Sequence, residues 1–175
     1  FLVGKDHFLQ NFFIKKIKKS ITQNNSMEKF FFIGGFDPPE TIIQSLYATD
    51  IFQSQKLIIL RNPNGLKGKS REELLNYVQK PIKENILILT QDEFSIKNKL
   101  INTLSSLLNP ISTQTPFYND FIIWARIFIK SYDLHLVDQN DLNLLIKLNS
   151  ENLYFLHSAI EKLSLNAENG KKISK

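Results

Sequence analysis

Residues 64–70 of this 175-residue chain, Asn-Gly-Leu-Lys-Gly-Lys-Ser, have the composition of a phosphate-binding loop. In such loops, backbone N–H groups and a lysine surround the phosphate oxygens at the start of a helix. Lys69 and Ser70 would supply the ammonium and the hydroxyl group. The complete motif also needs a glycine five residues before Gly68, where this chain has Pro63. Proline has no N–H donor and a fixed φ, so we interpret the stretch as a connecting loop. An active ATPase using Lys69 and Ser70 is the alternative.

A second chemical candidate is the pair Asp92-Glu93, which follows the apolar stretch Ile86–Leu89. Carboxylates beside a nucleotide bind magnesium, but Thr90 and Gln91 separate this pair from the strand, which again favours a connecting loop. The chain has no cysteine, and its three histidines are scattered at no metal-ligand spacing. The sequence also has no nucleophile elbow and no triad pattern. We therefore expect no catalytic residue, no cofactor and no metal site.

The segments around these loops alternate between strand and helix patterns. Apolar strands are predicted at Phe1–Val3, Phe30–Ile33, Lys56–Leu60 and Asn85–Leu89. Helical spacing of apolar residues follows each strand, at residues 8–17, 38–47, 70–79 and 95–108. Asp6 is the expected N-cap of the first helix. Strands that are apolar along their whole length and alternate with helices imply a parallel sheet covered on both faces. The predicted fold class is therefore α/β.

The pattern changes after residues 110–116, which contain two prolines and several hydroxyl side chains. Three helical patterns follow, at Asp120–Tyr132, Asp138–Leu148 and Ser150–Leu165. No further strand is expected in this part. The sequence thus predicts an α/β domain over residues 1–116 and a small helical domain over residues 117–175.

Charge and composition narrow the choice of partners only slightly. Lys and Arg number 22 against 17 Asp and Glu, which gives a net charge of +5 and favours acidic partners. The densest basic cluster, Lys15 to Lys19, reads as a solvated helix face, with a nucleic-acid-binding domain as the alternative. No apolar run approaches the ~20 residues of a membrane span. The lack of cysteine fits a reducing compartment.

The apolar pair Ile51-Phe52 stands between the polar residues Asp50 and Gln53. Polar residues on both sides suggest an exposed turn, where large apolar side chains reduce solubility unless a partner covers them. The two side chains either pack into the protein's own core or bind a partner, and the local pattern leaves both open.

Three segments, in matching order and spacing, resemble the delta subunit family of the bacterial DNA polymerase III clamp loader. They are Phe1–Leu9, Asp50–Leu60 and Asn152–Leu165. The first is similar to the family's opening strand, Gly-x-Asp turn and helix start. The second is similar to its apolar pair, polar turn, basic residue and strand, and the third to the last helix of its second domain. The family continues into a helical collar domain, which we expect to be absent here, and we also expect N-terminal residues to be missing.

The resemblance implies an AAA+-like parallel sheet flanked by helices and followed by a small three-helix lid domain. It implies a cytoplasmic subunit of the DNA polymerase III holoenzyme that acts in DNA replication without catalytic activity of its own. Such a subunit binds the sliding clamp (the beta subunit) and helps to open it for loading onto primed DNA. Other clamp-loader subunits, its neighbours in the complex, hydrolyse the ATP.

The resemblance also assigns a role to the apolar pair. In the family, this pair inserts into a hydrophobic pocket on the clamp. The clamp-binding residues that it implies here are Tyr47, Ala48, Thr49, Asp50, Ile51 and Phe52. Tyr47 stands where a typical clamp-binding peptide has glutamine, so the match to that peptide is loose.

Overall fold

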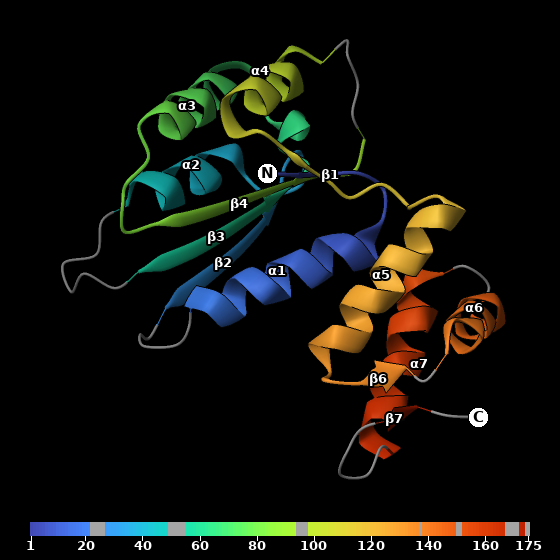
Figure 1. The fold of residues 1–175 in the computed structure, drawn as a ribbon. Helices are drawn as coiled ribbons and strands as arrows, with labels where there is room; N and C mark the ends of the chain where they lie inside the picture. Colours follow the sequence, from blue (N-terminus) through green and yellow to red (C-terminus); the bar gives the residue numbers. More distant parts are fainter. Residues whose placement is uncertain are drawn as a thin grey trace. The chain divides into compact units, whose positions relative to one another are not determined.

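The computed structural model describes residues 1–21, 27–48, 55–93, 98–136, 138–149, 152–166 and 172–173. The chain divides into two compact units, Phe1–Gln114 and Thr115–Lys175 (Figure 1). None of the described helices is long and apolar enough to span a membrane.

A five-stranded sheet forms the centre of the first unit. Its strands are β1 (Leu2–Val3), β2 (Glu28–Ile33), β3 (Lys56–Arg61), β4 (Ile86–Gln91) and β5 (Ile111–Ser112). All neighbours pair in parallel, in the order β2-β3-β4-β1-β5. The predicted α/β fold with a parallel sheet is therefore confirmed.

Helices cover both faces of this sheet (Figure 1). They are α1 (His7–Ile21) on one face and α2 (Pro39–Tyr47), α3 (Gly68–Gln79) and α4 (Lys99–Leu108) on the other. Successive residues of β3 serve the two faces in turn: Leu57 and Ile59 pack under α1, whereas Ile58 and Leu60 pack under the other helices. Both sets are buried, which explains why the strand is apolar along its whole length.

Two helices of this unit, α1 and α4, begin next to a residue whose side chain caps their first turn. The Asp6 side chain accepts a hydrogen bond of 3.0 Å from the Leu9 N–H, which confirms it as the cap of α1. Asn98 accepts from the N–H groups of Leu100 and Ile101 and sets the start of α4 at Lys99. The described part of this helix is thus shorter than the predicted 95–108.

The strand β5 lies within residues 110–116, a segment in which the sequence predicts no strand. Both of its residues are exposed, so it carries no apolar pattern that a sequence could reveal. It forms because β1 offers it free carbonyl groups: the N–H of Ile111 donates to Phe1 O at 2.8 Å, and that of Thr113 donates to Val3 O at 2.7 Å.

Three helices make up most of the second unit, as predicted. They are α5 (Tyr118–Ser131), α6 (Gln139–Leu148) and α7 (Leu153–Asn166), and α5 packs against both others. Their buried residues are Phe121, Ala125, Phe128, Ile129, Leu142, Ile146, Leu153, Leu156 and Ile160. Two short parallel strands, β6 (His135–Leu136) and β7 (Lys172–Ile173), are a further departure from the all-helical expectation. With only two residues each, these strands are too short to show an alternation of apolar and polar residues in the sequence.

Candidate functional site

The carboxyl ends of β1 and β4 form the topological switch point of the sheet. From β1 the chain crosses one face through α1 to β2, and from β4 it crosses the other face through α4 to β5. Ligands of open α/β sheets bind in the crevice outside the strands at such a point. This edge is therefore the place to look for nucleotide chemistry.

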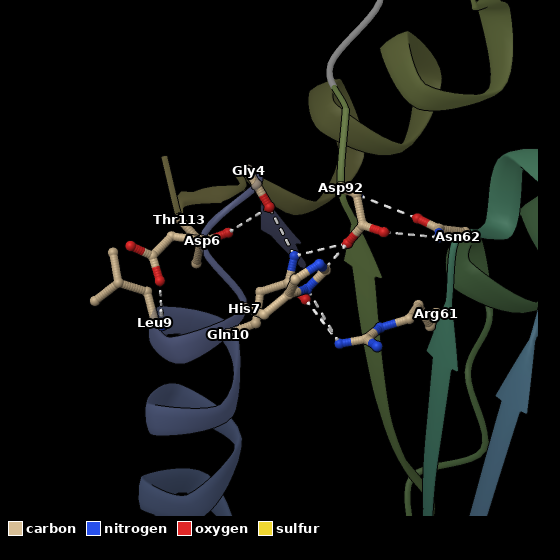
Figure 2. A network of polar contacts seen from close by, with 9 residues as sticks. All are labelled: Gly4, Asp6, His7, Leu9, Gln10, Arg61, Asn62, Asp92 and Thr113. Carbon is tan, nitrogen blue, oxygen red and sulfur yellow. Dashed lines mark hydrogen bonds and ion pairs between the residues drawn. The ribbon is translucent and has the colours of Figure 1, made fainter. Parts of the chain in front are cut away.

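Gln10 of α1 occupies this place with a fully buried side chain. Its Nε2 group donates to Gly4 O at 2.7 Å and to Asp92 Oδ1 at 3.1 Å (Figure 2). Gly4, directly after β1, lies so close to β5 that an added Cβ would stand 2.1 Å from the carbonyl carbon of Thr113. The turn after β1 therefore holds backbone and a glutamine side chain where a phosphate-binding loop would need open space.

Asn62 joins the ends of β3 and β4. Its Nδ2 donates to Asp92 Oδ2 at 2.9 Å, and its Oδ1 accepts from the Asp92 N–H at 3.1 Å. Asn62 has a φ of 51°, in the left-handed region that asparagine tolerates better than most residues. This reciprocal pair fixes the Asp92 carboxylate at the centre of the network in Figure 2.

Arg61 and His7 complete the network. The Arg61 guanidinium lies 3.4 Å from Gln10 Oε1 and 3.4 Å from His7 Nδ1, and His7 Nδ1 lies 3.6 Å from Asp92 Oδ1. Burial by itself raises the pKa of Asp92. The hydrogen bonds from Asn62 and Gln10, with the nearby His7 and Arg61, outweigh burial and lower this pKa below its usual value. The carboxylate is thus held ionised by the protein's own donors.

The glycine-containing stretch of residues 64–70, which we interpret as a connecting loop, leads from β3 through a short turn into α3. Gly65 packs against the turn after β2, where an added Cβ would stand 2.2 Å from Gly34 O. Pro63 is buried and opens a short 3₁₀ turn, η1 (Pro63–Gly65). The Lys69 side chain is 87% exposed and lies 3.7 Å from Glu73, one turn further along α3. Gly65 thus allows two stretches of backbone to pack closely, and Lys69 lies at the surface.

The two carboxylates of the other candidate pair, Asp92 and Glu93, make different contacts in the structure. Asp92 belongs to the polar network, whereas the exposed Glu93 pairs with the equally exposed Lys5 at 2.9 Å. Among the described residues, no cluster of His, Asp and Glu could hold a metal ion. Sequence reasoning missed the roles of Gln10, Arg61 and Asn62. The available signal was a pair of polar residues at the carboxyl end of each central strand, Arg61-Asn62 and Gln91-Asp92.

The structure describes the predicted clamp-binding residues only in part. Thr49, Asp50, Ile51 and Phe52 lie outside the described residues. Tyr47, the last residue of α2, is 45% exposed; its hydroxyl donates to Glu73 O at 3.1 Å and its ring packs edge-on against Tyr77. Ala48, also exposed, follows this helix.

Lys56 ties together the two flanks of segment 49–54. Its side chain is almost fully buried, with only 7% exposed, and its Nζ donates to Ala48 O at 3.2 Å. The ammonium also lies over the Phe30 ring, 5.8 Å from the centroid. A buried lysine at the start of β3 thus fastens the end of α2 to the sheet on the other side of the segment.

Comparisons with known proteins agree with this architecture. The model of the family described as "DNA polymerase III, delta subunit" matches residues 1–114. Among solved structures, the chain is similar to the DNA clamp loader delta protein (YqeN) of Bacillus subtilis, with a TM-score of 0.78 and 17% sequence identity. That match covers 98% of this chain and 54% of the Bacillus protein, so this chain spans about half of its length. A comparison with curated protein sequences gives no match.

At this identity, the structural likeness establishes a shared fold. The family model reaches further, because it covers more than half of the chain and includes the whole of the parallel sheet. The chain belongs to the DNA polymerase III delta subunit family.

Proposed function

We propose that this protein is a clamp-loader subunit that binds the sliding clamp and helps to open it for loading onto primed DNA. The observation that carries the proposal is the family match over residues 1–114, which contain the sheet and the predicted clamp anchor. In this role the protein acts in the cytoplasm together with the other clamp-loader subunits and contributes binding energy rather than chemistry.

Ile51 and Phe52 are the proposed anchors, and Tyr47 to Asp50 lead into them. Burying one large apolar side chain is worth roughly 1.5–3 kcal/mol, so two anchors in a pocket dominate a small interface. The contact between Lys56 and Ala48 supports this assignment, because it fixes the chain on both sides of segment 49–54. Fixed flanks lower the conformational entropy that the segment loses when it binds.

The occupied switch point supports a subunit that does not process nucleotide. The turn after β1 has only Gly4, Lys5 and Asp6 before α1 begins. The Gln10 side chain of α1 donates a hydrogen bond to Asp92 next to this turn. The alternative, an ATPase using Lys69 and Ser70, would place its phosphates on β3, away from the switch point. If the wild type bound ATP and Lys69→Ala abolished this binding, the ATPase alternative would be supported. We expect that ATP shifts the thermal stability of neither the wild type nor Lys69→Ala.

Binding to the sliding clamp of the same organism tests the proposal. We expect the wild-type chain to bind and Ile51→Ala/Phe52→Ala to lose at least tenfold in affinity, since roughly 1.4 kcal/mol already corresponds to a factor of ten. Phe36→Ala is the matched control: this residue is 86% exposed in the turn that follows the carboxyl end of β2. Circular dichroism verifies that all variants fold.

The outcomes separate cleanly. A folded double variant that binds like the wild type refutes the anchor, and a wild-type chain that does not bind the clamp refutes the function for this chain. Unfolding of the double variant would assign Ile51 and Phe52 to the protein's own core. Single variants Ile51→Ser and Phe52→Ser then measure each position separately.

A further inference from the structure

Helix α1 carries most of the net charge of the chain. It contains four lysines and no Asp or Glu, which amounts to +4 of the total of +5. Each of the other described helices has a net charge between −1 and +1, because its Lys and Arg residues occur singly or beside Asp and Glu. Positive charge is therefore concentrated on one element of the structure.

Three of these residues, Lys15, Lys16 and Lys19, are exposed, and we call them the α1 lysines. The helix meets the sheet through its apolar residues, since Ile14 and Ile17 pack against the side chains of β3 and β4. Among the described helices of the first unit, α1 is the only one on its face of the sheet (Figure 1). No neighbouring helix of this unit therefore separates the α1 lysines from a ligand.

The structure does not neutralise this charge. Within the described part of the chain, none of the α1 lysines forms an ion pair. The same holds for the exposed Lys67 and Lys99, but their surroundings differ. Lys67 precedes a helix in which two cations are matched by two carboxylates, and Lys99 is the single charged residue of α4. The density of like charge distinguishes α1 from these positions.

The helix itself accounts for only part of this charge. A cation in the last turn of a helix is favourable, because it lies near the partial negative charge of the terminal carbonyl groups. Lys18 and Lys19 are in that turn, whereas Lys15 and Lys16 precede it. Like charges one turn apart, as at Lys15 and Lys19, repel each other and weaken a helix. A bound anion would remove this repulsion.

The composition of the face favours a phosphate backbone over an acidic protein. Protein interfaces are depleted in lysine and depend on buried apolar or aromatic anchors. Among the described residues, none of the large apolar side chains that are exposed belongs to α1. Half or more of all protein–DNA hydrogen bonds go to phosphate and sugar oxygens, and lysine is a common donor. Single-stranded DNA is a poorer fit, because its sites add exposed aromatic rings on which bases stack.

The spacing of the α1 lysines also fits a duplex. Lys15 and Lys19 are separated by about 6 Å along the helix axis, at 1.5 Å per residue. Every second phosphate of one duplex strand is separated by about 7 Å along the DNA axis. The Lys16 ammonium lies 4.8 Å from the centroid of the Phe12 ring, a contact that holds its side chain beside Lys15.

We propose that the α1 lysines bind the phosphate backbone of duplex DNA without reading its sequence. This inference goes beyond the proposed function, which assigns no DNA contact to this chain, and it does not depend on the clamp anchor. Each phosphate that a lysine neutralises releases counterions, so that the logarithm of the affinity falls with the logarithm of the salt concentration by about 0.9 per contact. Three contacts contribute a slope of about −2.7.

Fluorescence anisotropy with a short labelled DNA duplex tests this inference. The test variant is Lys15→Gln/Lys16→Gln/Lys19→Gln, which keeps residues that favour a helix and removes the three charges. We expect it to lose at least about tenfold in affinity at about 50 mM NaCl, with a salt dependence shallower by about two to three units of slope.

Two further variants control for net charge and for folding. Lys67→Gln/Lys80→Gln/Lys99→Gln removes the same charge from exposed lysines elsewhere in the first unit, and we expect a loss of at most about threefold at the same salt concentration. Replacing the three α1 lysines by arginine keeps the charge, and this variant should bind the duplex as the wild type does. Circular dichroism verifies that all variants fold.

Each outcome supports or overturns the site. Equal losses in the test variant and the dispersed control would show that DNA responds only to net charge, which overturns it. A wild type that does not bind the duplex at about 50 mM NaCl overturns it as well. Unchanged DNA affinity with slower association to the purified sliding clamp would assign the α1 lysines to a protein partner instead. Ile51→Ala/Phe52→Ala should bind the duplex like the wild type, so that failure of the clamp anchor and failure of this inference are observed separately.

Discussion

Replacing Asp92 by alanine should destabilise the first unit far more than the same change at its neighbour Glu93. Asp92 accepts hydrogen bonds from Asn62 Nδ2 at 2.9 Å and from Gln10 Nε2 at 3.1 Å. Hydrogen bonds to a charged acceptor contribute about 1.5–3 kcal/mol each. Gln10 is fully buried but keeps its bond to Gly4 O. Because Gln10 keeps this other bond and the Asp92 side chain is 27% exposed, the expected loss for Asp92→Ala is below the sum of the two bonds, about 2–4 kcal/mol in the free energy of unfolding.

Glu93→Ala is the natural control, because it removes a carboxylate one position along the chain. The Glu93 side chain is 70% exposed, and its pair with Lys5 is equally solvated. Such surface pairs contribute about 0–1 kcal/mol. Urea unfolding followed by circular dichroism gives both values, with the slope of each transition compared to verify that the unfolding behaviour is unchanged.

This comparison refutes the reasoning if the two variants lose equal stability, or if Glu93→Ala loses more. A magnesium-holding pair would behave differently: the wild type would gain stability from added magnesium, and both variants would lose most of that gain. We expect no effect of magnesium on any of the three proteins.

Two further predictions concern the same edge of the sheet. The lowered pKa of Asp92 contributes stability that is present above its unfolded value, about 3.9, and is lost as the pH falls through the lower folded value; Asp92→Asn should make the acid side of a plot of unfolding free energy against pH shallower. Gly65→Ala should cost about 2–3 kcal/mol because its Cβ would overlap Gly34 O, and Gly68→Ala, with a φ of 53° but open space around it, only about 1 kcal/mol. Thermal or urea unfolding measures both, and a larger loss at Gly68 would contradict the packing role of Gly65.

Local patterns were sufficient for the parts of the fold in which one residue's role depends on its neighbours in sequence. The buried run Leu57 to Leu60 predicts an interior strand because both of its faces are covered. Asp6 predicts the start of α1 because the group it caps lies only three residues away. By contrast, both residues of β5 are exposed, and the strand forms through its pairing with β1, so no local sequence pattern predicts it.

The polar network could not be derived from the sequence for a related reason. Gln10 and Asp92 are 82 positions apart and Asn62 is 30 positions from Asp92, so only the order of the strands brings them together. The same limit affected the glycine-rich loop after β3. Spacing identifies a glycine but does not say whether it makes room for a phosphate or, as at Gly65, for another stretch of backbone.

The hydrogen bond from Lys56 to Ala48 has a mechanical consequence. A partner that holds segment 49–54 and moves away pulls on the amino end of β3 as well as on the end of α2. β3 is an interior strand, bonded in register to β2 on one side and β4 on the other. A pull along its axis loads both ladders in shear, so many hydrogen bonds share the force instead of opening one after another. Ala48 and Lys56, the described residues on either side of the segment, are thus tied to a strand whose hydrogen bonds on both sides resist such a pull.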